Sequence, residues 1–198
     1  CCRDHGARLP HVGAHVYASD PWSAAADATI SDFYILCDSD TRTPGLQVGS
    51  GEDPAGTCTA SADGSGAINA AGSVPGATYL ITDTSPLWPG RELARIDIPA
   101  DFDLGFTLTP SADNVNSDWA SIIHVTASGE DCCDYGDRVP GVWFRRSTRR
   151  LHVRDGSTNN GDNGCDPDVE LALDVPSAVR VEVRATAVEV FINDMSVC

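Results

Sequence analysis

Apolar and polar side chains alternate along much of the chain after Tyr79. In residues 102–108, Phe and Leu take every second position, and Asp, Gly and Thr lie between them. The same alternation runs through residues 179–184 and resumes at Val188 after a turn near residues 185–186. A period of two is typical of strands that bury one face, so we expect a hairpin over this last region.

A further segment, residues 119–125, is apolar on both of its faces. This pattern is typical of a central strand that is covered by a second sheet. The pattern of a long amphipathic helix does not occur. Many short strands, separated by turns rich in Asp, Gly, Asn and Pro, favour an all-β fold in which two antiparallel sheets form a sandwich.

Composition divides the chain into three parts. Residues 1–38 contain enough aromatic and aliphatic side chains to form strands, whereas residues 39–76 consist mainly of small and polar residues. The second part buries too little apolar surface to offset the entropy of ordering a core. We interpret it as a linker or surface excursion, and residues 77–198 as the main body of the sandwich.

The chain is strongly acidic, with 29 acidic residues against 13 basic ones and a formal net charge of -16. Nucleic acid is a poor partner for it, because a phosphate backbone requires a cationic footprint. No apolar run in the sequence is long enough to cross a bilayer, which predicts no membrane insertion. Because the sequence has neither a start methionine nor a signal peptide, we expect a mature or excised part of a secreted protein.

Cysteines are dispersed among polar loops, without the Cys-x-x-Cys pairs that are typical of zinc sites. An even number in this setting favours a disulfide-stapled fold and an oxidising, extracellular location. The eight cysteines are Cys1, Cys2, Cys37, Cys58, Cys132, Cys133, Cys165 and Cys198.

Several segments resemble laminin-G-like domains of the concanavalin A-like jelly-roll superfamily: residues 102–108, 119–126, 135–144 and 188–193. The run Tyr-Gly-Asp-Arg-Val-Pro within the third of these is a fairly specific motif. In such domains, the strand that ends in Asn is followed by a segment similar to residues 16–22, which here lies near the other end of the chain. The resemblance implies a jelly roll whose closing strands come from residues 1–38, either by permutation of the same domain or from a neighbouring repeat.

Spacing does not fix the disulfide pairing, because eight cysteines permit 105 connectivities. We expect Cys37 to pair with Cys58 across the linker, and Cys165 with Cys132 or Cys133. Both arrangements implied by the resemblance place Cys198 near Cys1 or Cys2, which makes these its expected partners.

Oxygen ligands of the kind that Ca²⁺ prefers are concentrated in residues 155–168. The segment is not an EF-hand, because its glycine falls one place late and its twelfth position is Asp rather than Glu. We interpret it as a solvated loop rich in Asx turns, with a calcium site as the alternative. Laminin-G-like domains often carry calcium at the sandwich rim, and the candidate ligands are Asp155, Asp162, Asp166 and Asp168.

Two charged clusters are further candidates. An acidic cluster surrounds the adjacent cysteines and consists of Glu130, Asp131, Asp134 and Asp137. It is a candidate cation site, although we interpret Asp137 and Arg138 as tying the loop to the sandwich through charge-assisted hydrogen bonds. A basic group is either a polar hairpin end or a dock for an acidic face of another copy, and it consists of Arg145, Arg146, Arg149 and Arg150.

Exposed tryptophans offer a flat surface on which a sugar stacks. Trp119 and Trp143 lie within strand patterns, so we expect them in the core. Trp88, on a turn, and Trp22 are the candidates for contact with a glycan or a protein partner, although the resemblance implies that Trp88 packs under the first strand.

The sequence contains no catalytic constellation. Related jelly-roll glucanases place two carboxylates on alternate positions of one strand, and no such Glu-containing run occurs here. The five histidines are scattered, and we interpret His124 as a hydrogen-bonded core residue.

We therefore expect a non-enzymatic, extracellular structural or adhesive module, a repeating unit of a surface or filamentous assembly. Its partners would be copies of itself or other matrix and surface proteins. The alternative is a lectin that binds glycan, with calcium as its candidate cofactor. A degenerate glycan-active enzyme is a third hypothesis.

Overall fold

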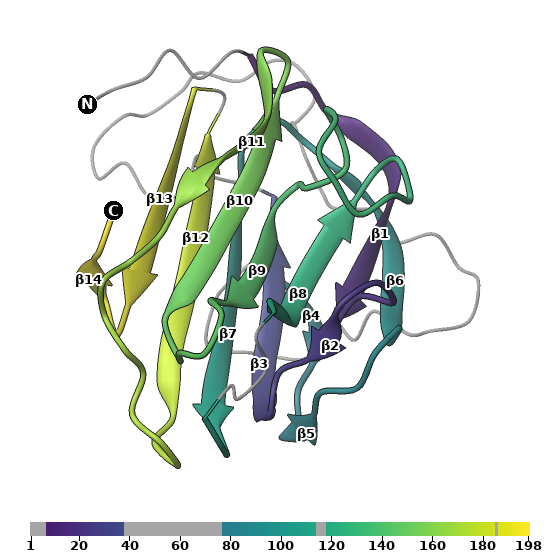
Figure 1. The fold of residues 1–198 in the computed structure, drawn as a ribbon. Coiled ribbons are helices and arrows are strands. Elements are labelled where there is room, and N and C mark those ends of the chain that lie inside the picture. The colour runs from purple at the N-terminus through teal and green to yellow at the C-terminus, as the bar shows by residue number, and fades with distance from the viewer. Residues whose placement is uncertain (1–6, 38–76, 114–117, 185) are drawn as a thin grey trace, which may run out of the picture.

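The computed structural model describes residues 7–37, 77–113, 118–184 and 186–198, which form two β-sheets packed face to face (Figure 1). The predicted antiparallel β-sandwich is confirmed. The described residues contain no helix, and so none that is long and apolar enough to span a membrane.

Sheet A carries the candidate site. Its strands follow the order β11 (Asn160–Cys165), β10 (Leu151–Ser157), β9 (Gly141–Phe144), β8 (Ala120–Thr126), β1 (His11–Ala18) and β6 (Glu92–Ile98). Neighbouring strands on this path are antiparallel, and β2 (Ala24–Ala25) adds a short parallel pair with β8.

Sheet B lies behind sheet A in Figure 1. Its strands follow the order β14 (Met195–Ser196), β13 (Ala187–Ile192), β12 (Ser177–Arg184), β7 (Phe102–Pro110), β3 (Ala28–Leu36) and β4 (Thr78–Ile81), and β5 (Ser85–Pro86) pairs with β3. The predicted hairpin is β12 and β13, in which Val181 pairs with Val190. Val181 also pairs with Leu104 of β7, so that one apolar row crosses three strands.

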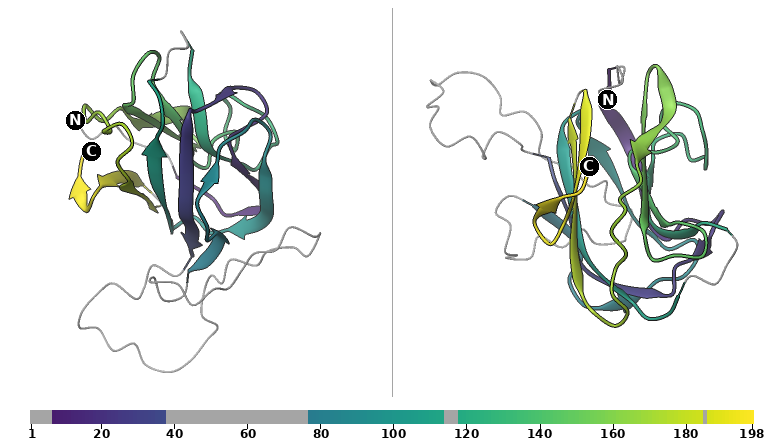
Figure 2. Two further views of the ribbon diagram at one scale, coloured as in Figure 1. Left: turned by 90° about the horizontal axis from the view of Figure 1, so that it is seen from below. Right: turned by 60° about the vertical axis from the view of Figure 1, so that its left-hand side comes forward.

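Two strands from the first 36 residues lie inside the sheets. β1 lies between β8 and β6, with Val16 paired to Val125 and to Ala94. β3 lies between β7 and β4, with Ile30 paired to Leu108. The right-hand view of Figure 2 shows the two layers that result. Residues 11–36 therefore belong to the same two sheets as the rest of the described chain.

Alternation of side chains separates the core from the outer face of each sheet. In β1, Ala14, Val16 and Ala18 are buried between the sheets, while His15 and Tyr17 point outward. β8 is buried along its whole length. Its outer face is covered by Trp22 and by the loop of residues 127–140 rather than by a second sheet, as the contacts of its histidine show.

The disulfide pairing differs from the expected one. Cys165, at the end of β11, is bonded to Cys198, which follows β14, so this bond joins an edge of sheet A to an edge of sheet B. Cys132 is bonded to its neighbour Cys133. The expected pairs of Cys165 with Cys132 or Cys133 are therefore wrong. Cys165 pairs with Cys198 instead, because the sheet edges that carry these two cysteines lie next to each other. The expected pairing of Cys198 with Cys1 or Cys2 is wrong for the same reason.

Cys37 is disulfide-bonded. Its expected partner, Cys58, lies outside the described residues, as do Cys1 and Cys2.

The predicted solvated loop at residues 155–168 is also wrong, because most of it forms the hairpin of β10 and β11. Hydrogen bonds between side chains, rather than burial of alternating apolar residues, stabilise this hairpin. Asn163 Nδ2 donates to Ser157 Oγ at 2.9 Å, and Asn160 Nδ2 donates to Asn163 Oδ1 at 2.9 Å. The backbone of β10 passes so close to Gly164 that a Cβ there would overlap it.

A buried ion pair connects the segment before β1 to β10. The Nε of Arg8 donates to Asp155 Oδ2, and its Nη1 donates to the backbone oxygen of Arg184 at 2.7 Å. The side chain of Asp155 is 0% exposed and that of Arg8 is 4% exposed. The other carboxylate oxygen of Asp155 is buried without a hydrogen-bond partner.

Candidate functional site

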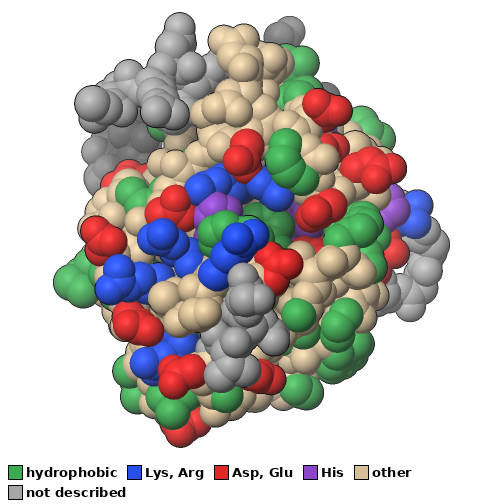
Figure 3. Space-filling model, viewed as in Figure 1, with side chains coloured by type: hydrophobic (Ala, Val, Ile, Leu, Met, Phe, Trp, Pro, Cys, Tyr) green, Lys and Arg blue, Asp and Glu red, His purple; other side chains and the backbone are tan. Residues whose placement is uncertain are grey.

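The outer face of sheet A carries a pocket of about 400 Å³. It lies over β9, β10 and β11 and is bordered by the loop of residues 127–140. Figure 3 shows this face, on which hydrophobic and histidine side chains occupy a hollow that acidic and basic side chains surround. A pocket that combines apolar surface with a few convergent polar groups is typical of a ligand site.

Trp143 forms the floor of the pocket. It lies in β9 between the core residues Val142 and Phe144, so its side chain points to the outer face. Its indole lies across Gly141, where a Cβ would overlap the ring. The guanidinium of Arg138 lies over the same indole, 4.9 Å from its centroid. Glycine at 141 therefore allows the tryptophan to lie flat on the sheet.

One wall of the pocket is an aromatic stack. The rings of Trp119 and His152 lie 4.0 Å apart with 19° between their planes. Trp119 is half-buried, just before β8, whereas His152 is buried in β10 opposite Trp143. The stack thus presents one partly exposed indole beside the floor of the pocket.

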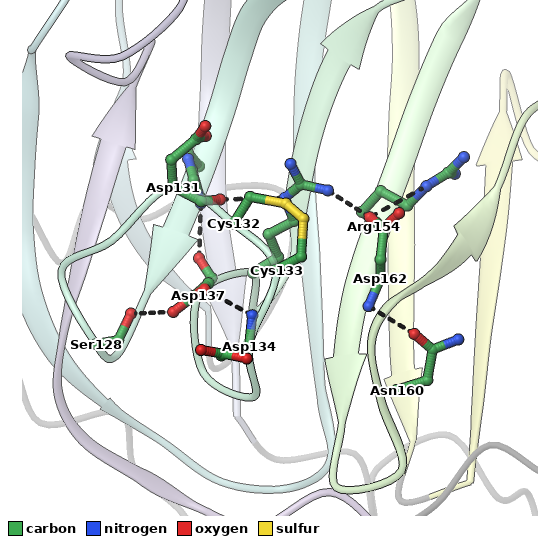
Figure 4. The surroundings of a disulfide bond; sticks show 11 residues. Ser128, Asp131, Cys132, Cys133, Asp134, Asp137, Arg154, Asn160 and Asp162 are labelled. Atoms are coloured by element: carbon green, nitrogen blue, oxygen red, sulfur yellow. Dashed lines mark hydrogen bonds and ion pairs between the residues drawn. A yellow bond between two sulfur atoms is a disulfide. The ribbon is translucent and has the colours of Figure 1, made fainter.

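Another part of the lining is the disulfide between Cys132 and Cys133 (Figure 4). Asp137 fixes the loop that carries it, because its carboxylate accepts from the Ser128 hydroxyl at 2.6 Å and from the Asp134 backbone N–H at 2.7 Å. Both bonds lie within the loop, whereas the sequence predicted that Asp137 would tie the loop to the sandwich. The adjacent sulfurs and the half-buried Trp119 supply apolar surface to the pocket, whereas Trp143 is only 2% exposed.

A chain of ion pairs connects the polar side chains of the pocket. Asp162 accepts from Nη1 of Arg138 and lies 3.6 Å from Nε of Arg154. Nη2 of Arg154 donates to Asp166 Oδ2 at 2.9 Å. The other oxygen of Asp166 accepts from Nδ1 of His152 at 2.6 Å. These contacts hold the polar groups in place before any ligand arrives.

The same contacts set the charges in the pocket. Burial lowers the pKa of His152, an effect that Asp166 opposes and Arg154 reinforces, so His152 is neutral at pH 7. Although burial alone would raise the pKa of Asp166, hydrogen bonds from Arg154 and His152 lower it. With two guanidinium groups against three carboxylates, the lining carries one net negative charge.

A second hollow, of about 320 Å³, lies on the outer face of sheet B. Two rings of its lining, those of Tyr34 and Phe191, are half-buried, and the guanidinium of Arg180 lies 3.8 Å from the centroid of the Phe191 ring.

A candidate metal-binding cluster borders the pocket on sheet A. Within the described ranges, only Asp20, His124 and Asp131 form a group of three acidic, histidine or cysteine ligands whose atoms lie within 4.8 Å of one another. Asp20 and His124 are fully buried, and Asp131 also lines the pocket.

Trp119 and Trp143 occupy different places from those expected, whereas the surface candidates Trp88 and Trp22 are exposed. Trp143 is buried, but it faces the pocket and not the core between the sheets, and Trp119 is half-buried in the wall. Trp88 is 46% exposed and lies under the guanidinium of Arg91, 4.3 Å from the ring centroid. Trp22 is 41% exposed and meets His124 edge-on, with centroids 5.5 Å apart.

The four candidate calcium ligands do not converge. Asp155 is buried against Arg8, while Asp162 and Asp166 share Arg154 in the pocket. The side chain of Asp168 is 95% exposed and lies 3.5 Å from Arg150. Each of these four carboxylates thus has an arginine where a shared cation would be needed.

The predicted basic group lies at the turn between β9 and β10, and acidic residues of the same chain surround it. Arg149 lies 3.0 Å from Asp113 and 3.7 Å from Glu170. Arg146 lies 3.5 Å from Asp118, and its guanidinium lies 5.4 Å from the centroid of the Trp119 ring. Arg150 is paired with Asp168, and Arg145 also has a partner. These pairs reduce the charge available to dock another acidic surface.

Sequence reasoning missed the pocket. The outward direction of Trp143 was present in the alternation Val142-Trp143-Phe144, and the adjacent Cys132 and Cys133 were visible as an unusual pair. His152 carried no such signal, because only the pairing of β9 with β10 brings it beside Trp143. Comparisons of the chain with protein-family models, with curated proteins and with solved structures find no match.

Proposed function

We propose that this chain is a non-enzymatic, extracellular adhesive module that binds a glycan in the pocket on sheet A. The observation that carries this proposal is the combination of the half-buried Trp119, the floor of Trp143 and the Cys132–Cys133 disulfide around one hollow. A pyranose ring has an apolar face that packs on such a surface, and its hydroxyls require fixed polar partners at the edge.

The polar groups at the edge favour a neutral sugar. Arg154, Asp162 and Asp166 neutralise one another in large part, and their ion pairs hold them in fixed positions. Both the donors and the acceptors that sugar hydroxyls need are therefore present. The single net negative charge of the lining disfavours an anionic ligand such as a sulfated or phosphorylated sugar.

The same ion pairs favour binding over hydrolysis. A general acid at neutral pH needs a carboxyl group with a raised pKa, whereas the pKa of Asp166 is lowered by its hydrogen bonds from Arg154 and His152, which outweigh the effect of burial. A carboxylate held ionised in this way binds hydroxyl groups but does not protonate a leaving group.

Two further observations support the extracellular and adhesive parts of the proposal. Disulfide bonds at Cys37, Cys132–Cys133 and Cys165–Cys198 fit an oxidising compartment. The sandwich fold is compatible with the laminin-G-like resemblance of residues 135–144. Assembly into repeats stays a proposal from the sequence, and sedimentation of the purified chain over a range of concentrations tests it.

The test of glycan binding compares Trp119, which is half-buried in the pocket wall, with Trp88, which is 46% exposed outside the pocket. We expect the wild-type protein to bind one class of neutral glycan on an array, and Trp119→Ala to weaken that binding roughly 30-fold, the equivalent of about 2 kcal/mol for a central aromatic contact. Trp88→Ala removes an exposed indole outside the pocket and should leave the affinity unchanged.

Calorimetry with the strongest array ligand measures both variants, and thermal unfolding verifies that both are folded. A wild-type protein that binds no glycan would refute the proposal. Equal binding by Trp119→Ala and the wild type would place the glycan elsewhere and refute this site.

A further inference from the structure

Three side chains from separate parts of the chain meet beside the pocket. Asp20 follows β1, His124 lies in β8 and Asp131 lies in the loop that precedes β9. Their ligand atoms lie within 4.8 Å of one another. Asp20 Oδ2 lies 3.2 Å from His124 Nδ1, a separation that two ligands of one metal ion also show when their metal bonds are about 2.0–2.1 Å long.

The surroundings of His124 direct one ring nitrogen toward the two carboxylates. Its Nε2 lies 2.7 Å from the backbone oxygen of Asp137. A carbonyl only accepts hydrogen bonds, so Nε2 carries the proton. In the neutral ring the lone pair then lies on Nδ1, which faces Asp20. A histidine whose second N–H donates to a backbone carbonyl is the usual arrangement of a metal ligand.

Asp20 is held in a fixed orientation. Its Oδ1 accepts from the backbone N–H groups of Trp22 at 3.0 Å and of Ser23 at 2.7 Å. Its Oδ2 accepts from Nε1 of Trp143 at 3.1 Å. These three hydrogen bonds order the carboxylate without help from a metal.

Asp131 adds a second carboxylate to the group. Its backbone oxygen accepts from Nε of Arg138 at 3.2 Å, which positions the residue at the edge of the pocket. Two carboxylates and one imidazole, each with a ligand atom within 4.8 Å of the others, favour a cation there. The rings of Trp22 and Trp143 make T-shaped contacts with the His124 ring, with centroids 5.5 and 5.1 Å away, and enclose the site.

We propose that Asp20, His124 and Asp131 form a binding site for a divalent transition-metal ion, with Zn²⁺ as the best fit. One imidazole and two carboxylates suit zinc and its neighbours in the first transition row, whereas Ca²⁺ takes oxygen ligands. Three protein ligands leave a further position for water or for an oxygen of a ligand. These residues are distinct from the four aspartates that the sequence suggested for calcium.

Calorimetric titration of Zn²⁺ into chelator-treated protein tests the site, without any glycan present. We expect one ion to bind per chain and Ca²⁺ not to compete. Asp131→Asn should weaken zinc binding by at least ~10-fold. Asp134→Asn, in the same loop but outside the cluster, should bind as the wild type does. Because Asp131 is partly exposed, its variant should fold, and thermal unfolding without metal verifies this.

Nuclear magnetic resonance of the His124 ring supplies a second measurement. We expect zinc to shift the Nδ1 resonance and leave the proton on Nε2. If His124 instead carries protons on both nitrogens and bridges Asp20 and Asp137 as a cation, zinc will not displace its proton and the proposal fails. Absence of saturable zinc binding, or equal binding by Asp131→Asn, would also overturn it. Glycan binding is measured separately, so either result leaves that proposal standing.

Discussion

Replacement of Asp155 by asparagine tests whether the buried ion pair with Arg8 stabilises the protein at neutral pH. Burial raises the pKa of Asp155 to about 6, and the nearby charge and hydrogen bond of Arg8 oppose that rise only in part. One carboxylate oxygen is buried with no hydrogen-bond partner, which explains why the neutral acid is favoured. Transfer of the charged Asp155 carboxylate from water to this buried site costs more free energy than its attraction to Arg8 recovers.

The magnitude of the change in stability follows from the rise in the pKa of Asp155 from 3.8 to about 6. Because the folded protein binds this proton more tightly than the unfolded chain, Asp155 contributes stability at low pH that is lost as the pH rises through about 6. Each pKa unit corresponds to about 1.4 kcal/mol. Relative to Asp155→Asn, the free energy of unfolding of the wild type should therefore fall by about 2–3 kcal/mol between roughly pH 4 and pH 7.5.

Urea unfolding followed by tryptophan fluorescence, across this pH range, measures the difference between the two proteins. The unpaired Arg8 of the variant lowers its stability by the same amount at every pH, so the change with pH isolates the aspartate. Asp168→Asn, whose side chain is 95% exposed, is the matched control and should show little change. A difference that is constant with pH, or that moves in favour of the wild type at high pH, would refute the reasoning.

Other consequences of the structure are also measurable. Gly141→Ala places a Cβ within the Trp143 ring. We therefore expect the free energy of unfolding in urea to fall by about 1–3 kcal/mol and glycan binding to weaken. Wild-type values for both would show that the indole does not lie across residue 141. Replacing Cys165 and Cys198 by serine opens a loop with a sequence separation of 33 and should cost about 3–4 kcal/mol. The same replacement at Cys132 and Cys133 opens no long loop and should lower the free energy of unfolding much less. Equal losses of stability in the two double variants would contradict this account.

Strands with apolar alternation were predictable from the sequence, as the hairpin of β12 and β13 illustrates. Val179, Val181 and Val183 occupy every second position, and all three are buried. β11 was not predictable in this way. Its sequence Asn-Gly-Asp-Asn-Gly-Cys has low strand propensity, and the strand is held by hydrogen bonds among Asn160, Asn163 and Ser157.

The candidate site was less accessible to sequence reasoning than the fold. Trp143 was assigned to the core because it is apolar and lies in a strand, although its neighbours Val142 and Phe144 already occupy the inward positions. The contact of Trp119 with His152 joins a residue just before β8 to one in β10, and only the pairing of β8, β9 and β10 creates it. The bond between Cys165 and Cys198 likewise depends on where two sheet edges meet.

The interior positions of β1 and β3 have a consequence for the rate of folding. Val16 pairs with Val125, and Ile30 pairs with Leu108, so the central contacts of both layers join residues that are distant in sequence. A protein with such a high contact order closes large loops before these contacts form, which slows its folding to milliseconds or longer. During that time, the edges of both strands lack their final neighbours and are open to pairing with other molecules.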